Sequence, residues 1–207
     1  ERCKNSKYKF VLLHGFAGSS RDVFFPWLKT ELEKQGHSVF CPDLPQSDEP
    51  RVEEQTRFVM DNVPLDEQTI VVGHSLGGVV AMNIAQKLGG KIAKLILVDS
   101  FIRPEFTDQS RPHVEKSFDW KFDFEKIKQN VGEIVMLADL SYAVIPEAQS
   151  KEMRELLGVG LKLVKPAGDH FKELEEPEII RTLTETGWIP LPEDRLPLEL
   201  PHVEKYQ

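Results

Sequence analysis

The chain has 207 residues, enough to bury the core of one ordinary domain without disulfide bonds. Its 26 basic and 34 acidic residues give a net charge of −8, which argues against a nucleic-acid-binding surface spread over the domain. No apolar run approaches the length of a membrane span, and we expect no signal peptide. The two cysteines form no disulfide framework, so we expect a reducing, cytoplasmic compartment.

Strand and helix patterns alternate along the chain, which is typical of a parallel sheet with helices on both faces. The expected strands are Tyr8–Leu13, His37–Cys41, Thr69–Val72, Leu95–Val98, Glu133–Leu137 and Leu161–Val164. The expected helices are Pro26–Gln35, Arg51–Asn62, Val79–Leu88, Glu147–Leu157 and Pro177–Thr184. The sequence therefore predicts an α/β fold, a doubly wound and mostly parallel sheet over residues 8–185, with flanks at 1–7 and 186–207.

One long segment, from Phe101 to Trp120, breaks this alternation with prolines and aromatic residues. A loop of this length in a compact domain is usually a functional cover or a mobile segment. We interpret it as a short lid over the serine described next. Equally, its aromatic side chains can be ordinary core contacts of a loop that folds back on the domain.

The most informative motif is Gly73-His74-Ser75-Leu76-Gly77, which lies between a β-branched apolar run and an apolar helix pattern. Glycines on both sides of Ser75 permit the sharp strand-to-helix turn that exposes a nucleophilic hydroxyl above a sheet. The pentapeptide alone is a weak signal, but its strand–turn–helix context makes it a strong one. We expect Ser75 to be the nucleophile of a serine hydrolase.

A serine hydroxyl needs a base to take its proton. In this architecture the chain order is serine, acid and histidine, and the histidine follows the last strand. His170 has that place, in a glycine-containing loop before the closing helix, so we expect it to be the base. His74 lies beside the nucleophile, where packing is the better interpretation.

The developing oxyanion needs two backbone N–H groups. Leu76, directly after the serine, is expected to supply one of them from the helix N-terminus. The second is expected from the loop after the first central strand, where Gly15 lets the chain turn inward and Phe16 is the candidate.

The acid is less well determined. Asp139 directly follows the strand Glu133–Leu137 and is the preferred candidate to set the tautomer of the imidazole. Asp99, at the end of the preceding strand, is an alternative position from which a carboxylate can reach the histidine. A water-bridged or missing acid stays open as well.

From about Lys9 to Thr184 the chain resembles the α/β-hydrolase family, and more narrowly small serine hydrolases of the retinoblastoma-binding-protein-nine type. The resemblance rests on the serine motif, on 27–34 and 124–128, and on Asp169-His170-Phe171. It implies Ser75 as nucleophile and His170 as base. The family has its acid four residues before a proline, and Tyr142 holds that position here before Pro146, with Asp139 as a nearby substitute.

The two ends of the chain are similar to a different family. The segments Gly187–Asp194 and Leu196–Pro201 resemble part of the leucyl-tRNA synthetases, and Glu1–Lys4 looks like half of a Cys-x-x-Cys zinc knuckle. This resemblance implies a hydrolase domain inserted into a synthetase. Alternatively, the proline-rich end is a simple tether. A lone cysteine cannot hold zinc, so we expect neither a metal nor a cofactor.

Two hypotheses follow. In the first, the chain is a serine hydrolase of a small acyl ester, with the aminoacyl ester of a transfer RNA as a possible substrate through a host synthetase. In the second, favoured by Tyr142 at the acid position, it is a catalytically silent docking or spacer module. The sequence indicates neither a membrane partner nor an oligomeric state.

Overall fold

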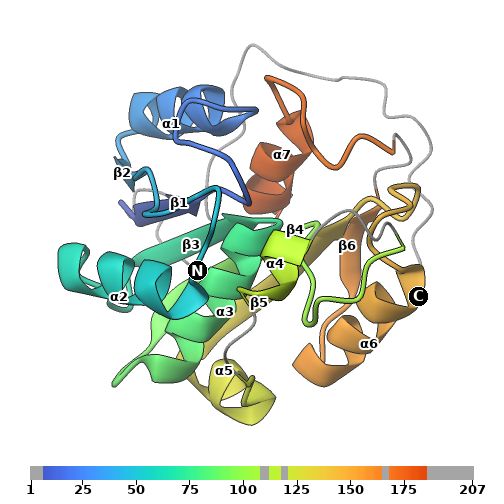
Figure 1. The fold of residues 1–207 in the computed structure, drawn as a ribbon. Helices are drawn as coiled ribbons and strands as arrows, with labels where there is room; N and C mark the ends of the chain where they lie inside the picture. The colour runs from blue at the N-terminus through green and yellow to red at the C-terminus, as the bar shows by residue number, and fades with distance from the viewer. Residues whose placement is uncertain (1–6, 108–111, 118–120, 165–167, 186–207) are drawn as a thin grey trace.

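The computed structural model describes residues 7–107, 112–117, 121–164 and 168–185, and within them six strands form one sheet (Figure 1). The strand order is β2-β1-β3-β4-β5-β6, and every neighbouring pair is parallel. The strands are β1 (Lys9–Leu13), β2 (Ser38–Phe40), β3 (Thr69–His74), β4 (Ile92–Val98), β5 (Val131–Ala138) and β6 (Leu161–Val164). The predicted doubly wound α/β fold is confirmed.

Helices cover both faces of this sheet (Figure 1). They are α1 (Phe25–Lys34), α2 (Val52–Asn62), α3 (Leu76–Lys87), α4 (Pro112–Glu115), α5 (Phe124–Asn130), α6 (Glu147–Leu157) and α7 (Pro177–Glu185). Helices α1 and α7 bury Leu28 and Leu183 in the cluster on one face, whereas α2 and α3 bury Val59 and Val79 in the cluster on the other.

Local sequence explains where several helices begin and end. Proline in the first turn of α1 has a fixed φ that suits a helix start. The Asp123 side chain caps α5 by accepting a hydrogen bond from the Lys126 N–H at 3.0 Å. Gly158 ends α6 in the left-handed conformation, with φ of 65°. Helices α4 and α5 were not among the predicted elements, because both are short and their apolar patterns cover few turns.

The central strands β3 and β4 are buried along their whole length. Because all strands run in parallel, their carboxyl ends meet at one edge of the sheet. The register sets His74 beside Val98, and Val98 beside Leu137. The residues that directly follow β3, β4 and β5 are therefore neighbours at that edge.

The long segment after β4 packs onto the core at its described positions. Phe101 and Val114 are buried, and the rings of Phe101 and Phe106 meet edge to face with centroids 5.0 Å apart. Gln149 of α6 accepts hydrogen bonds from the N–H groups of Ile102 and Arg103 at 2.9 and 3.0 Å. For these aromatic residues the core-contact interpretation is confirmed.

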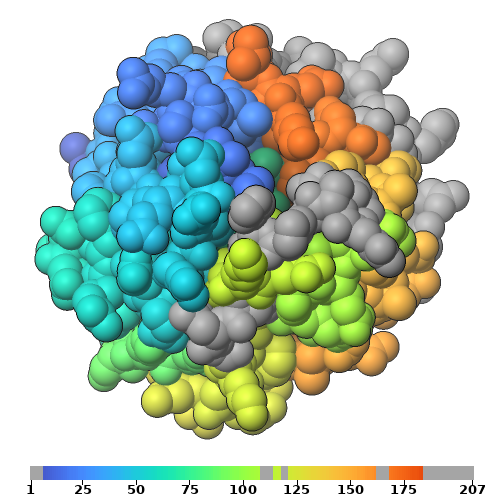
Figure 2. Space-filling model, in the orientation of Figure 1, coloured from blue at the N-terminus to red at the C-terminus, as the bar shows by residue number. Residues whose placement is uncertain are grey.

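In the space-filling view, the cyan segment around residue 50 and the yellow-green segment around α4 meet near the middle of the visible face (Figure 2). The expected lid aromatics Phe118 and Trp120 lie outside the described residues. No helix in the described part of the chain combines the length and apolar character that a membrane crossing needs.

Candidate active site

The turn between β3 and α3 presents Ser75 in a strained backbone conformation. Its φ is +55° and its ψ is −122°, outside the regions that L-residues favour. Its N–H donates to the Val98 carbonyl at 2.9 Å, and its carbonyl accepts from the Gly78 N–H at 3.0 Å. These bonds hold the strained residue at the carboxyl edge of the sheet, as the nucleophile motif predicts.

The glycines of the motif are required by close backbone approach. A methyl group on Gly77 would lie 2.1 Å from the Leu13 carbonyl oxygen, and one on Gly73 would lie 2.5 Å from the Gly77 carbonyl oxygen. Neither position can accept a side chain unless the backbone moves. The strand β1, the turn and α3 are thereby fixed against one another.

His170 and Asp99 form the buried polar pair of the site. The imidazole Nδ1 is hydrogen-bonded to Asp99 Oδ2, and each residue is 5% exposed or less. Asp99 follows β4 directly and is held by its own N–H, which donates to the Leu137 carbonyl at 2.8 Å. Because Nδ1 is engaged by a carboxylate, Nε2 is the ring nitrogen available to take a proton.

Asp139, the preferred candidate for the acid, makes different contacts. Its carboxylate accepts backbone N–H groups of Ser141 and Gly168, both at 3.1 Å, and of Asp169 and His170 at 2.9 and 3.2 Å. The expected bond from Asp139 to the imidazole is thus replaced by bonds to the backbone of the histidine loop. The ring partner is the alternative candidate, Asp99, because the carboxylate of Asp139 is turned toward these amides.

The backbone of Asp139 also contacts the Asp99 carboxylate. The Asp139 N–H donates to Asp99 Oδ1 at 3.0 Å, while Asp99 Oδ2 contacts the imidazole. Burial raises the pKa of Asp99 to about 6, against the effect of the Asp139 N–H, which favours the charged form. Since Asp99 and His170 share a hydrogen bond, they titrate as a pair.

His74 holds the histidine loop from the opposite side. Its Nε2 lies 2.7 Å from the His170 carbonyl oxygen, and its ring is 5.4 Å from that of Phe24 and 4.9 Å from that of His170. Burial, with a smaller contribution from His170, lowers the pKa of His74 to about 3. The ring therefore stays neutral and donates to the carbonyl.

This buried histidine predicts a loss of stability in acid. His74 titrates near 6.5 when unfolded but near 3 when folded, so below pH 6.5 the unfolded state binds a proton that the folded state excludes. Between pH 7 and pH 5 the free energy of unfolding should fall by roughly 2 kcal/mol more in the wild type than in His74→Gln. Urea titrations at both pH values measure this difference; equal pH dependence in the two proteins would refute the assignment.

Tyr142 lies against the imidazole. Its ring stacks on that of His170 with centroids 4.2 Å apart and an interplanar angle of 16°. The family resemblance places the acid at Tyr142, and the structure instead puts an aromatic surface there. No sequence pattern predicts this contact, because stacking depends on the path of the loop between β5 and α6.

The His14 side chain holds the expected oxyanion loop, which follows β1, in place. The His14 ring accepts a hydrogen bond from the Leu44 N–H at 2.8 Å through Nε2 and lies 2.9 Å from the Gly15 carbonyl oxygen through Nδ1. A methyl group on Gly15 would lie 3.1 Å from Ser75 Cβ, so the loop passes close to the serine. In the described part of the chain, no hydrogen bond uses the N–H of Phe16 or Leu76.

Ser75 and His170 line one cavity of about 130 Å³. Its other lining residues are His14, Gly15, Phe16, Gly18, Asp22, Val23, Phe25, His74 and Lys172. No described residue of the segment 101–117 is among them. The cavity brings together the expected nucleophile, the expected base and Phe16, the expected second oxyanion residue.

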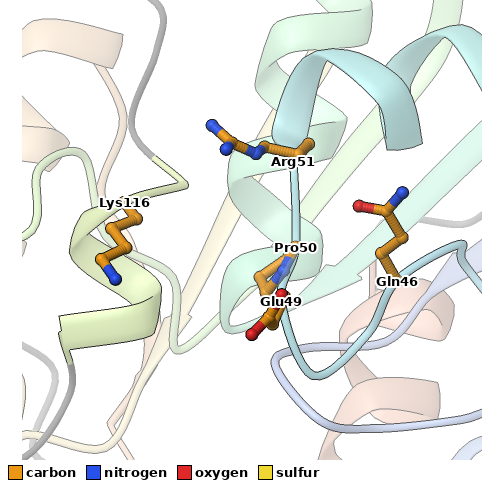
Figure 3. A pocket seen from close by; sticks show the side chains of 5 residues that line it. All are labelled: Gln46, Glu49, Pro50, Arg51 and Lys116. Carbon is orange, nitrogen blue, oxygen red and sulfur yellow. The ribbon is translucent and has the colours of Figure 1, made fainter.

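A larger hollow of about 260 Å³ lies between the start of α2 and α4 (Figure 3). Gln46, Glu49, Pro50, Arg51 and Lys116 line it. In the close-up, Arg51 and Lys116 stand on opposite sides of this hollow (Figure 3). It contains no paired nucleophile and base, so the smaller cavity is the candidate active site.

The family model for the alpha/beta hydrolase fold matches residues 8–155. The chain belongs to the α/β-hydrolase family. This family is built on a doubly wound sheet whose nucleophile follows a central strand, which is the position of Ser75.

Two individual hydrolases are similar in sequence to this chain over most of their own length. The putative hydrolase YdeN of Bacillus subtilis is 27% identical over 168 residues, which cover 79% of this chain and 86% of the relative. The serine hydrolase RBBP9 of Rattus norvegicus is 26% identical over 181 residues, which cover 86% and 95%. The expected likeness to serine hydrolases of the RBBP9 type is confirmed.

Solved structures agree with this fold. The crystal structure of the ydeN gene product from B. subtilis superposes with a TM-score of 0.75 at 24% identity, covering 87% of this chain and 98% of that one. Polyneuridine aldehyde esterase gives a TM-score of 0.63 at 17% identity, covering 88% and 100%.

Proposed function

We propose that the chain hydrolyses a carboxylic ester through Ser75, His170 and Asp99. The hydrogen bond between His170 and Asp99, at the cavity that Ser75 also lines, is the observation that supports this assignment. It supplies the orienting acid that Tyr142, at the family's usual acid position, cannot supply. That the chain is an esterase-type hydrolase follows from its family and its relatives.

The proposed chemistry has two halves. His170 Nε2 takes the proton of Ser75 as Oγ attacks the ester carbonyl, and the Phe16 and Leu76 N–H groups stabilise the oxyanion. The imidazolium then returns the proton to the departing alcohol, which leaves an acyl-serine. Water, deprotonated by the same nitrogen, attacks the acyl group and regenerates Ser75. Asp99 stays ionised and keeps the reacting tautomer of the ring.

The lining favours a short acyl group. A cavity of about 130 Å³ lies below the range of roughly 300–1,000 Å³ that is typical of drug-sized ligands. Phe25 and Val23 give it an apolar wall. We therefore propose acetyl to butyryl esters as the first substrates to test.

A fluorophosphonate probe tests the nucleophile. The wild type should form a covalent adduct, seen by intact-protein mass spectrometry, and should hydrolyse 4-nitrophenyl acetate. Ser75→Ala should do neither, because the attacking oxygen is absent. Ser38→Ala, which removes an exposed hydroxyl on β2, is the matched control and should react like the wild type. A folded wild type that neither reacts nor turns over would support the silent docking module instead.

An aminoacyl ester is the finer hypothesis. It rests on the resemblance of the terminal segments to leucyl-tRNA synthetases, and residues 1–6 and 186–207 lie outside the described residues. With a net charge of −8, a transfer RNA would have to be held by a host protein rather than by this domain. Hydrolysis of a 3′-aminoacyl adenosine faster than of its acetyl counterpart would favour it, and no preference would count against it.

A further inference from the structure

We propose that Lys172 selects esters whose alcohol portion carries a negative charge. This inference rests on the proposed function, because it names the substrate class of the same cavity. It concerns specificity, and Lys172 takes no part in bond making or breaking.

Lys172 lines the cavity of Ser75 and His170 and is exposed to solvent. Its Nζ lies 5.7 Å from the centroid of the Tyr142 ring, and that ring is stacked on the imidazole. A cation over an aromatic face is attracted by the ring quadrupole. These contacts keep the ammonium close to the reacting groups.

The charge of Lys172 has no counter-ion in the described part of the chain. Some lysines elsewhere do: Lys87 meets Glu53 at 2.7 Å, and Lys151 meets Glu147 at 2.6 Å. The cavity also holds the Asp22 carboxylate, which accepts a hydrogen bond from the Ser19 hydroxyl at 2.8 Å. The ammonium of Lys172 is therefore a cationic group of this lining that has no ion-pair partner among the described residues.

Burial is the main cause of the lowered pKa of His74, and the charge of Lys172 adds a small contribution in the same direction. The Tyr142 ring joins Lys172 to the His170 imidazole, and this contact assigns the ammonium to the alcohol side of the ester. His170, two residues earlier, gives its proton to the leaving oxygen, whereas Phe16 and Leu76 are assigned to the carbonyl oxygen. A carboxylate or phosphate on the alcohol would therefore come close to the ammonium.

The test compares two esters with one acyl group and similar leaving groups: 3-acetoxybenzoate, which is an anion, and its neutral methyl ester. The measured quantity is the kcat/KM for the anionic ester divided by the kcat/KM for the neutral ester, at low ionic strength. We expect this ratio to be about two- to fivefold lower in Lys172→Gln than in the wild type, the size expected for an exposed ion pair. Lys172→Arg should keep the wild-type ratio, and added salt should reduce it.

Lys91→Gln is the matched control. It removes an exposed lysine directly before β4, at the opposite edge of the sheet, and should leave the ratio unchanged. An unchanged ratio in Lys172→Gln, or an equal fall in Lys91→Gln, would overturn the inference while the proposed function stands. If the wild type hydrolyses neither ester, both the proposed function and this inference fail.

Discussion

Asp99→Asn should lower the kcat for ester hydrolysis by roughly 10³- to 10⁴-fold, the loss seen when the acid of such a triad becomes an amide. An asparagine is nearly the same size, but it cannot stabilise the imidazolium. Its amide can also donate to Nδ1, which favours the tautomer with its proton on Nε2. That tautomer cannot accept the proton of Ser75. Steady-state kinetics with 4-nitrophenyl acetate measure the effect, and circular dichroism checks that the variant is folded.

Asp139→Asn is the matched comparison, because it replaces the aspartate that follows the neighbouring strand β5 with the same amide. It weakens the acceptor for four backbone N–H groups, so we expect the free energy of unfolding to fall by about 1–3 kcal/mol. In the folded protein, kcat should fall by less than about tenfold, because the ring keeps its partner. If Asp139→Asn lowers kcat more than Asp99→Asn, the assignment of the acid is wrong.

Gly77→Ala should destabilise the protein severely, by about 3 kcal/mol or more. The new methyl group would lie 2.1 Å from the Leu13 carbonyl oxygen and 2.6 Å from that of His14. Relief requires α3 to move away from β1, which breaks contacts at the centre of the sheet. Urea unfolding of purified protein measures the change, and loss of soluble expression is its extreme form.

Gly89→Ala serves as the control for that substitution. A methyl group at Gly89 meets nothing within 4 Å, and the residue has an ordinary φ. Its free energy of unfolding should change by no more than about 0.5 kcal/mol. A Gly77→Ala protein as stable as Gly89→Ala would show that the backbones are farther apart than described here.

The nucleophile and base could be proposed from sequence because each has a local signature. Ser75 lies between glycines where an apolar strand gives way to a helix, and few other structures need that combination. His170 follows the last strand in the order that the fold requires. The structure places both at one cavity, as this reasoning predicts.

The acid could not be decided in the same way. Asp99 and Asp139 each follow one of two adjacent parallel strands, and Val98 at the end of β4 is paired with Leu137, next to the end of β5. Both carboxylates therefore reach the same edge, and chain order does not distinguish them. The choice depends on side-chain direction: one carboxylate meets the ring, and the other meets the backbone of its loop.

Other features could not be predicted from the sequence, because they depend on contacts between segments that are distant along the chain. The Lys172–Tyr142–His170 arrangement joins two loops whose paths no periodicity encodes. No motif around His14 predicts its hydrogen bond to Leu44, which lies 30 residues later in the chain. Short helices such as α4 are set by the packing of one or two residues, here Val114.

The three residues assigned to the chemistry all have a positive φ: 55° at Ser75, 46° at Asp99 and 61° at His170. Such a conformation is cheaper for glycine than for any residue with a side chain. Glycine at any of the three would relieve backbone strain but remove a reacting group, so the most stable version of this fold is not the most active one.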